Sequence, residues 1–134
     1  MRTGLSMVAM AIALAAPAAA ASAPDWSKAT RIDIAMANFN YTPSRIVLRH
    51  GEAYVLHFTN AAKGGHDFTA KSFFSAAHVV GTDAARTLSG TVALHGGESR
   101  DIRLVAPAIV GIYQVHCSHF LHESFGMKGE IVVQ

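Results

Sequence analysis

One short stretch near the C-terminus concentrates sulfur and imidazole side chains. It reads YQVHCSHFLHESFGMKGEIVVQ and contains the only cysteine of the 134-residue chain, Cys117, together with His116, His119, His122 and Met127. A thiol in such company could be an inert core residue, a reactive nucleophile or a metal ligand. The rest of the chain has to decide among these three roles.

The N-terminus predicts a secretory signal peptide. Met1 and Arg2 make a basic start, residues 5–16 form an apolar run that is short for a membrane span, and small residues in an A-x-A pattern follow. We predict cleavage after Ala21, so that residues 1–21 are the signal peptide and residues 22–134 form one domain in the periplasm. A retained N-terminal anchor is the alternative.

Export makes the single cysteine informative. Small exported domains usually pair their cysteines in disulfides, and a lone cysteine has no partner within its own chain. Cys117 must therefore be buried, used chemically or bound to a metal. Without Arg2 the chain keeps ten Lys and Arg against nine Asp and Glu, and it has no basic run. Nucleic acid is therefore not an expected partner.

Alternating apolar and polar residues predict an all-β domain. About seven short strands separated by turns are typical of an antiparallel sandwich or a Greek-key barrel. Residues 71–80 lack a period of two, so a short helix or an irregular excursion is expected there. Strand character is expected in the segments 31–36, 45–49, 54–59, 66–69, 86–94, 100–105, 111–117 and 128–134.

The side-chain alternation also predicts which ligand candidates point inward. Cys117 shares a face with Tyr113 and Val115, which are typical core residues, whereas His116 belongs to the opposite face. Met127 has the same parity as Ile131 and Val133 of the last strand and should also point inward, either as an axial ligand or as a core methionine.

Three of these side chains suit one metal site. Cys117, His122 and Met127 lie on one loop between two strands, and they need a fourth ligand from elsewhere. Two histidines, a cysteine and a weak axial methionine form the ligand set of blue-copper electron-transfer sites. The best candidate for the other histidine is His66, because the two glycines before it allow a tight bend. Zinc would accept the cysteine and histidines, but a thioether adds little for zinc.

The segment Cys117-x4-His122-x4-Met127, followed by KGEIVV, resembles the ligand loop and last strand of the cupredoxins, which include plastocyanin and azurin. The resemblance implies a Greek-key β-sandwich that binds one copper ion, cycling between Cu(I) and Cu(II), through His66, Cys117, His122 and Met127. One departure is Asp67, because an asparagine follows the first histidine in many blue-copper proteins. A carboxylate close to the copper thiolate would favour Cu(II).

The remaining histidines have weaker claims. We expect His116 to be a surface or hydrogen-bonded residue and His119 to be exposed in the loop. Four more fall on turns or outward faces and are expected to be non-ligands, with a secondary copper contact as the alternative: His50, His57, His78 and His95. Three apolar loop residues form either a docking rim around His122 for a redox partner or part of the core: Phe120, Leu121 and Phe125.

These observations favour a monomeric periplasmic electron carrier over an enzyme. No proton-transfer pair, nucleophile triad or open metal site is evident in the sequence, and His116-Cys117 is followed by serine rather than by the second histidine of multicopper oxidases. A copper-binding or delivery protein with the same ligands is the alternative. A partner-binding domain without metal is the third hypothesis.

Overall fold

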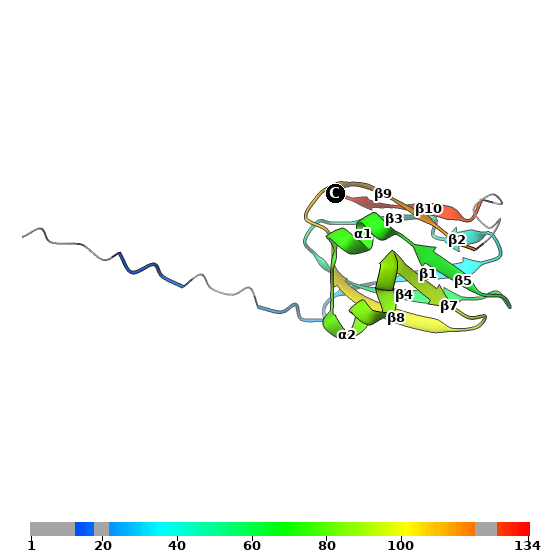
Figure 1. Cartoon of the computed structure of the whole chain (residues 1–134), viewed down its shortest axis with the longest axis horizontal. Coiled ribbons are helices and arrows are strands. Elements are labelled where there is room, and N and C mark those ends of the chain that lie inside the picture. Colours follow the sequence, from blue (N-terminus) through cyan, green and yellow to red (C-terminus); the bar gives the residue numbers. More distant parts are fainter. Residues whose placement is uncertain (1–12, 18–21, 120–125) are drawn as a thin grey trace, which may run out of the picture.

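The computed structural model describes residues 13–17, 22–119 and 126–134. Within these ranges the chain forms two five-stranded sheets that pack as a β-sandwich (Figure 1). The prediction of an all-β sandwich is confirmed. No helix in the described part of the chain is long and apolar enough to span a membrane.

The first sheet has the strand order β2-β1-β4-β8-β6. Its strands are β1 (Thr30–Ala37), β2 (Asn40–Thr42), β4 (Ala53–Asn60), β6 (His78–Val79) and β8 (Ser99–Val105). The second sheet has the order β3-β10-β9-β5-β7. Its strands are β3 (Arg45–Leu48), β5 (His66–Thr69), β7 (Thr91–Leu94), β9 (Gly111–His116) and β10 (Lys128–Val133).

Both sheets are mixed, whereas the alternation pattern predicted antiparallel pairing. β1 pairs in parallel with β4, and β3 pairs in parallel with β10. The reason for the first pair is topological. After β2 the chain crosses into the second sheet to form β3, and it then returns to the first sheet as β4 in the direction of β1. The alternation of side chains is the same in both kinds of pair, so it does not reveal strand direction.

The core lies between the inward faces that the alternation predicted. Ile34 and Met36 of β1 and Leu56 and Phe58 of β4 are buried, and the residues between them are more exposed. Phe68 of β5 sits at the centre of an aromatic cluster. Its ring centroid is 4.9 Å from that of Phe58, 5.3 Å from Tyr41 and 6.4 Å from Phe74. This packing gives β5 a rigid backing directly beside its first two residues, His66 and Asp67.

The segment after β5 is helical in three short pieces: α1 (Lys71–Ala76), α2 (Gly81–Ala84) and the 3-10 helix η1 (Ala85–Gly90). Of the two possibilities for 71–80, the chain adopts a short helix followed by β6. The prediction of a strand over 86–94 is wrong for its first half. Ser89 and Gly90 have φ of 60° and 75°, which breaks an extended strand. A Cβ on Gly90 would lie 2.5 Å from the Cα of Lys71, so only glycine fits against α1 there.

Candidate metal centre

Cys117 and Met127 are held side by side by the last two strands of the chain. Cys117 follows β9 and Met127 precedes β10, and these strands pair antiparallel from His116 and Lys128 onward. The backbone N–H of Cys117 donates a hydrogen bond to the carbonyl of Met127 at 3.1 Å. Cys117 is 1% exposed and Met127 is 0% exposed. Both side chains point inward, as their parity predicted.

His66 brings an imidazole to the sulfur from the neighbouring strand. It is the first residue of β5, it is 2% exposed, and its Nδ1 lies 4.0 Å from Sγ of Cys117. Thiolate and imidazole ligands at typical bond lengths on one ion, about 110–120° apart, are roughly 3.6–3.8 Å from each other. The observed separation is close to this value, so the two groups fit a shared ion.

Asn38 fixes the orientation of the His66 ring. Nε2 of His66 lies 3.2 Å from Oδ1 of Asn38, which follows β1. An amide oxygen can only accept a hydrogen bond, so Nε2 carries the proton and Nδ1 presents its lone pair toward Cys117. A hydrogen bond to the second ring nitrogen is how proteins commonly orient a metal-binding histidine. The sequence patterns missed Asn38 because it is an exposed residue in the turn between β1 and β2, far from His66 in the sequence.

The carboxylate of Asp67 braces the segment that follows Cys117. Its Oδ1 accepts hydrogen bonds from the backbone N–H of Ser118 at 2.9 Å and from the hydroxyl of Thr69 at 2.7 Å. Its Oδ2 accepts a hydrogen bond from the hydroxyl of Ser118. The backbone N–H of Asp67 points toward Sγ of Cys117 at 3.5 Å. The carboxylate is thus oriented by Ser118 and Thr69, and it replaces the bracing amide expected from the family resemblance.

Tyr41 holds the same residue from the other sheet. Its hydroxyl donates a hydrogen bond to the carbonyl of Asp67 at 2.6 Å. Burial, followed by the charges of Cys117 and Asp67, raises the pKa of Tyr41, so the phenol keeps the proton that it donates. Both polar backbone groups of Asp67 are therefore held, because its N–H faces Sγ of Cys117 and its carbonyl accepts the hydrogen bond from Tyr41.

The electrostatic surroundings keep Cys117 protonated in the absence of metal. Burial raises the pKa of the Cys117 thiol, and hydrogen bonds from the backbone N–H groups of Asp67 and His119 lower it. The negative charge of Asp67 raises it again, and the net direction is upward. A metal must be bound by the thiolate, so binding at this site releases a proton.

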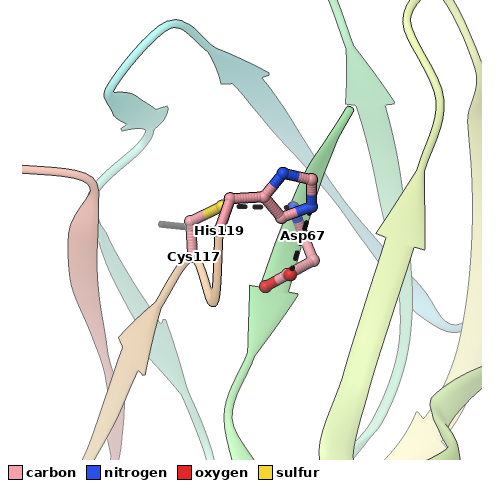
Figure 2. A group of neighbouring side chains, drawn as sticks. All are labelled: Asp67, Cys117 and His119. Atoms are coloured by element: carbon pink, nitrogen blue, oxygen red, sulfur yellow. Dashed lines mark hydrogen bonds and ion pairs between the residues drawn. The ribbon is translucent and has the colours of Figure 1, made fainter. Parts of the chain in front are cut away.

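His119 joins the group, although it was expected to be a bystander in the loop. One ligand atom each from Asp67, Cys117 and His119 lie within 4.8 Å of one another (Figure 2). Nε2 of His119 is 3.7 Å from Oδ2 of Asp67, and the side chain is 43% exposed. Residues two apart on an extended chain share a face, so the parity of His119 with Cys117 was the available signal.

The other predicted site residues divide into two groups. His122 and the apolar residues proposed to surround it, Phe120, Leu121 and Phe125, lie outside the described residues. His116 is half-buried and pairs with Lys128 of β10 in the sheet register. It is not one of the residues that gather around Cys117 in the described part of the chain.

His95 and His57 lie on a turn and on an outward strand face, as expected, and each has a neighbour that the sequence did not predict. His95 lines a cavity of about 140 Å³ together with His66 and His119. Nδ1 of His57 lies 2.6 Å from Oδ1 of Asp101 on the outer face of the first sheet, away from the sulfur. His95 thus becomes the fourth histidine of interest, and it lies in the turn after β7.

Comparison with solved structures supports the same fold. The auracyanin of the photosynthetic bacterium Roseiflexus castenholzii, in its dithionite-reduced form, is 22% identical, with a TM-score of 0.58 over 79% of this chain and 98% of that protein. Auracyanin A, a "blue" copper protein from Chloroflexus aurantiacus, is 18% identical, with a TM-score of 0.57 over 78% of this chain and 98% of its own.

A multicopper oxidase shares the fold over a fraction of its length. The McoA oxidase of Aquifex aeolicus is 14% identical, with a TM-score of 0.63, and the match covers 87% of this chain but 32% of the oxidase. No curated protein matches the sequence. The sequence profile of the cupredoxin-like domain matches residues 4–133, nearly the whole chain. The chain therefore belongs to the cupredoxin-like domain family.

Proposed function

We propose that the protein is a mononuclear copper-binding electron carrier with His66, Cys117, His122 and Met127 as its ligands. The observation that carries this proposal is the 4.0 Å separation of His66 Nδ1 and Cys117 Sγ, both buried beside the buried Met127. Membership of the cupredoxin-like family supports it.

The chemistry of these donors suits a redox ion. Thiolate and thioether are soft ligands that favour Cu(I), and imidazole binds either copper state, so the set serves both. Three of the donors lie in or beside strands of one sheet: His66 begins β5, Cys117 follows β9 and Met127 precedes β10. Hydrogen bonds to Asn38 and from Ser118 to Asp67 brace His66 and the segment after Cys117. Because His66, Cys117 and Met127 are buried in this frame, they should move little when the charge of a bound ion changes.

Copper addition to the purified protein tests this proposal. Cu(II) should produce an intense visible thiolate-to-copper band, and Cys117→Ala and His66→Ala should each abolish it. His50→Gln, at a turn remote from Cys117, is the matched control and should keep the band. Circular dichroism checks that each variant is folded. A folded wild-type protein without the band would contradict the blue-copper assignment.

A copper-delivery role is the second candidate. The observation that favours it is the presence of Asp67 and His119 within 4.8 Å of the ligand sulfur, since harder donors help to hold and exchange an ion. Electron self-exchange measured by nuclear magnetic resonance separates the two roles. Rapid exchange supports the carrier, whereas slow exchange combined with tight Cu(I) binding supports delivery.

Export and docking complete the proposal. The basic start, apolar run and A-x-A residues support a signal peptide over 1–21, release of residues 22–134 into the periplasm and function there as a monomer. N-terminal sequencing of the protein recovered from cells should begin at Ser22.

The redox partner is proposed to dock near Phe120, Leu121, His122 and Phe125. Multicopper oxidases share the fold, but Ser118 stands where their His-Cys-His motif has its second histidine, which favours a carrier over an oxidase.

A further inference from the structure

Three histidines from three different segments line one small cavity beside the proposed metal centre. His66 begins β5, His95 follows β7, and His119 lies in the loop after β9; Gly65, Ala93 and Leu94 complete the lining. The cavity volume is about 140 Å³. Since one water molecule occupies about 30 Å³ in the liquid, this space holds an ion together with a few waters.

The exposure of the three imidazoles decreases toward the sulfur. His95 is exposed, the side chain of His119 is 43% exposed, and His66 is buried with Nδ1 facing Cys117. The ring centroids of His66 and His119 are 6.3 Å apart, at an interplanar angle of 33°. The cavity therefore runs from the exposed imidazole of His95 to the buried imidazole of His66, whose Nδ1 faces Cys117.

The cavity wall at His95 is held by a buried polar frame. The side-chain N–H groups of Asn60, a fully buried residue at the end of β4, donate to the carbonyl of Gly64 at 2.9 Å and to that of Leu94 at 3.1 Å. The backbone carbonyl of Asn60 accepts a hydrogen bond from the backbone N–H of Gly97 at 2.9 Å. Asn60 thus ties the loop before His66 to the turn that carries His95.

Gly96 allows the same two turns to pack closely together. A Cβ on Gly96 would lie 2.1 Å from the carbonyl oxygen of Lys63, so a larger residue would push the turns apart. On the opposite wall, a Cβ on Gly65 would lie 3.3 Å from Cε1 of His119. The imidazole of His119 thus rests on Gly65 while its Nε2 faces the carboxylate of Asp67.

From this arrangement we propose that His95 and His119 form a capture port, with the carboxylate of Asp67 behind His119, through which Cu(II) reaches His66 and Cys117. The port rests on the proposed copper-binding function and assigns the path by which the site is loaded. Imidazole and carboxylate are suitable ligands for Cu(II), and the Asp67 charge attracts a cation. Loading is a ligand exchange without a change of oxidation state, in which Cys117 releases its thiol proton to water as its sulfur binds.

The rate of loading tests the port. Metal-free protein and its variants are mixed with Cu(II) in a stopped-flow spectrometer, and the growth of the thiolate-to-copper band is followed. His95→Gln should load about tenfold more slowly, as for a barrier raised by roughly 1.4 kcal/mol, and reach the same final absorbance. His50→Gln and His78→Gln, exposed histidines outside the cavity, should load at the wild-type rate. Wild-type loading by His95→Gln would overturn the port.

A second measurement keeps the port separate from the proposed function. In Cys117→Ala the blue band cannot form, and Cu(II) binding is followed by electron paramagnetic resonance and equilibrium dialysis. The Cys117→Ala, His95→Gln double variant should bind Cu(II) about tenfold more weakly than Cys117→Ala alone, with fewer coordinated nitrogens. Equal affinity and equal spectra would overturn the port. Absence of a band in folded wild-type protein would instead contradict the blue-copper site, and the dialysis comparison would still decide the port.

Discussion

The carboxylate of Asp67 accepts a hydrogen bond from the backbone N–H of Ser118 at 2.9 Å, which ties the residue after Cys117 to strand β5. The same carboxylate accepts hydrogen bonds from the hydroxyls of Ser118 and Thr69. An asparagine at this position could accept the bond to the N–H of Ser118, but it would carry no charge. Asp67 therefore combines a structural role with an electrostatic one, and substitutions can separate them.

Asp67→Asn should keep the loop in place and raise the reduction potential of bound copper. Removing the negative charge near the thiolate stabilises Cu(I) relative to Cu(II), and it also lowers the pKa of the Cys117 thiol in the metal-free protein. Voltammetry of the copper protein measures the potential, and Asp33→Asn, at an exposed position of β1, is the control. Asp67→Ala should in addition lower the free energy of unfolding by about 1–3 kcal/mol, since the N–H of Ser118 and the buried hydroxyl of Thr69 lose their charged acceptor. A lower potential in Asp67→Asn would contradict this account.

Asn38→Ala should weaken copper binding although Asn38 is not a ligand. Without the bond from Nε2 to Oδ1, the His66 ring can rotate and exchange tautomers, so Nδ1 is no longer aimed at Cys117. Loss of such an orienting partner typically costs roughly 10–100-fold in metal affinity. Competition with a copper chelator measures the affinity. Asn40→Ala, another exposed asparagine of the same hairpin, is the control, and equal affinities in the two variants would refute the orienting role.

The ion pair between Asp83 and Arg103 should make the stability of the fold dependent on acid. Oδ2 of Asp83 lies 3.0 Å from the backbone nitrogen and 2.9 Å from Nε of Arg103. Burial of Asp83 acts to raise the pKa of its carboxyl, but the hydrogen bonds and charge of Arg103 outweigh it, so the pKa is lowered from its ordinary value of 3.8. The ionised form is therefore favoured by folding, and the stabilisation is present above that pH.

This stabilisation should be lost as the pH falls below about 4, through the lowered pKa of the folded state. Asp83→Asn should lower the free energy of unfolding at pH 7 by about 1–3 kcal/mol and should flatten its decrease in acid. Urea unfolding at several pH values measures both quantities. The control is Asp33→Asn, whose side chain is 74% exposed. A steeper acid transition in Asp83→Asn would show that the sign is wrong.

Gly96→Ala should destabilise the fold and disturb the cavity at His95. The new Cβ would overlap the carbonyl of Lys63, so one of the two turns must move. Overpacking of this kind typically costs about 1–3 kcal/mol. Thermal unfolding and the copper loading rate report the two effects. Gly64→Ala is the matched control, because a Cβ there meets nothing within 4 Å, and it should be close to wild type in both measurements.

The sequence alone was sufficient for the sandwich and for the direction of the key side chains. An apolar residue at every second position predicts a half-buried strand whatever its neighbours are. The same alternation correctly predicted that Cys117 and Met127 point inward. It failed over 86–90, where the 3-10 helix η1, with left-handed backbone at Ser89 and Gly90, takes the place of the first half of the predicted strand. It also could not show that β1 and β4 run parallel, because parallel and antiparallel strands share one side-chain period.

The surroundings of the thiol were decided only by the tertiary structure. His66 follows two glycines and could be proposed from the sequence, but its distance to Cys117 depends on the pairing of β5 with β9. Four residues with contacts near the site come from other strands and turns: Asn38, Tyr41, Asn60 and His95. No regular spacing in the sequence predicts their contacts. A loop motif can specify which atoms bind a metal, whereas the residues that orient those atoms and open a path to them are brought together by folding.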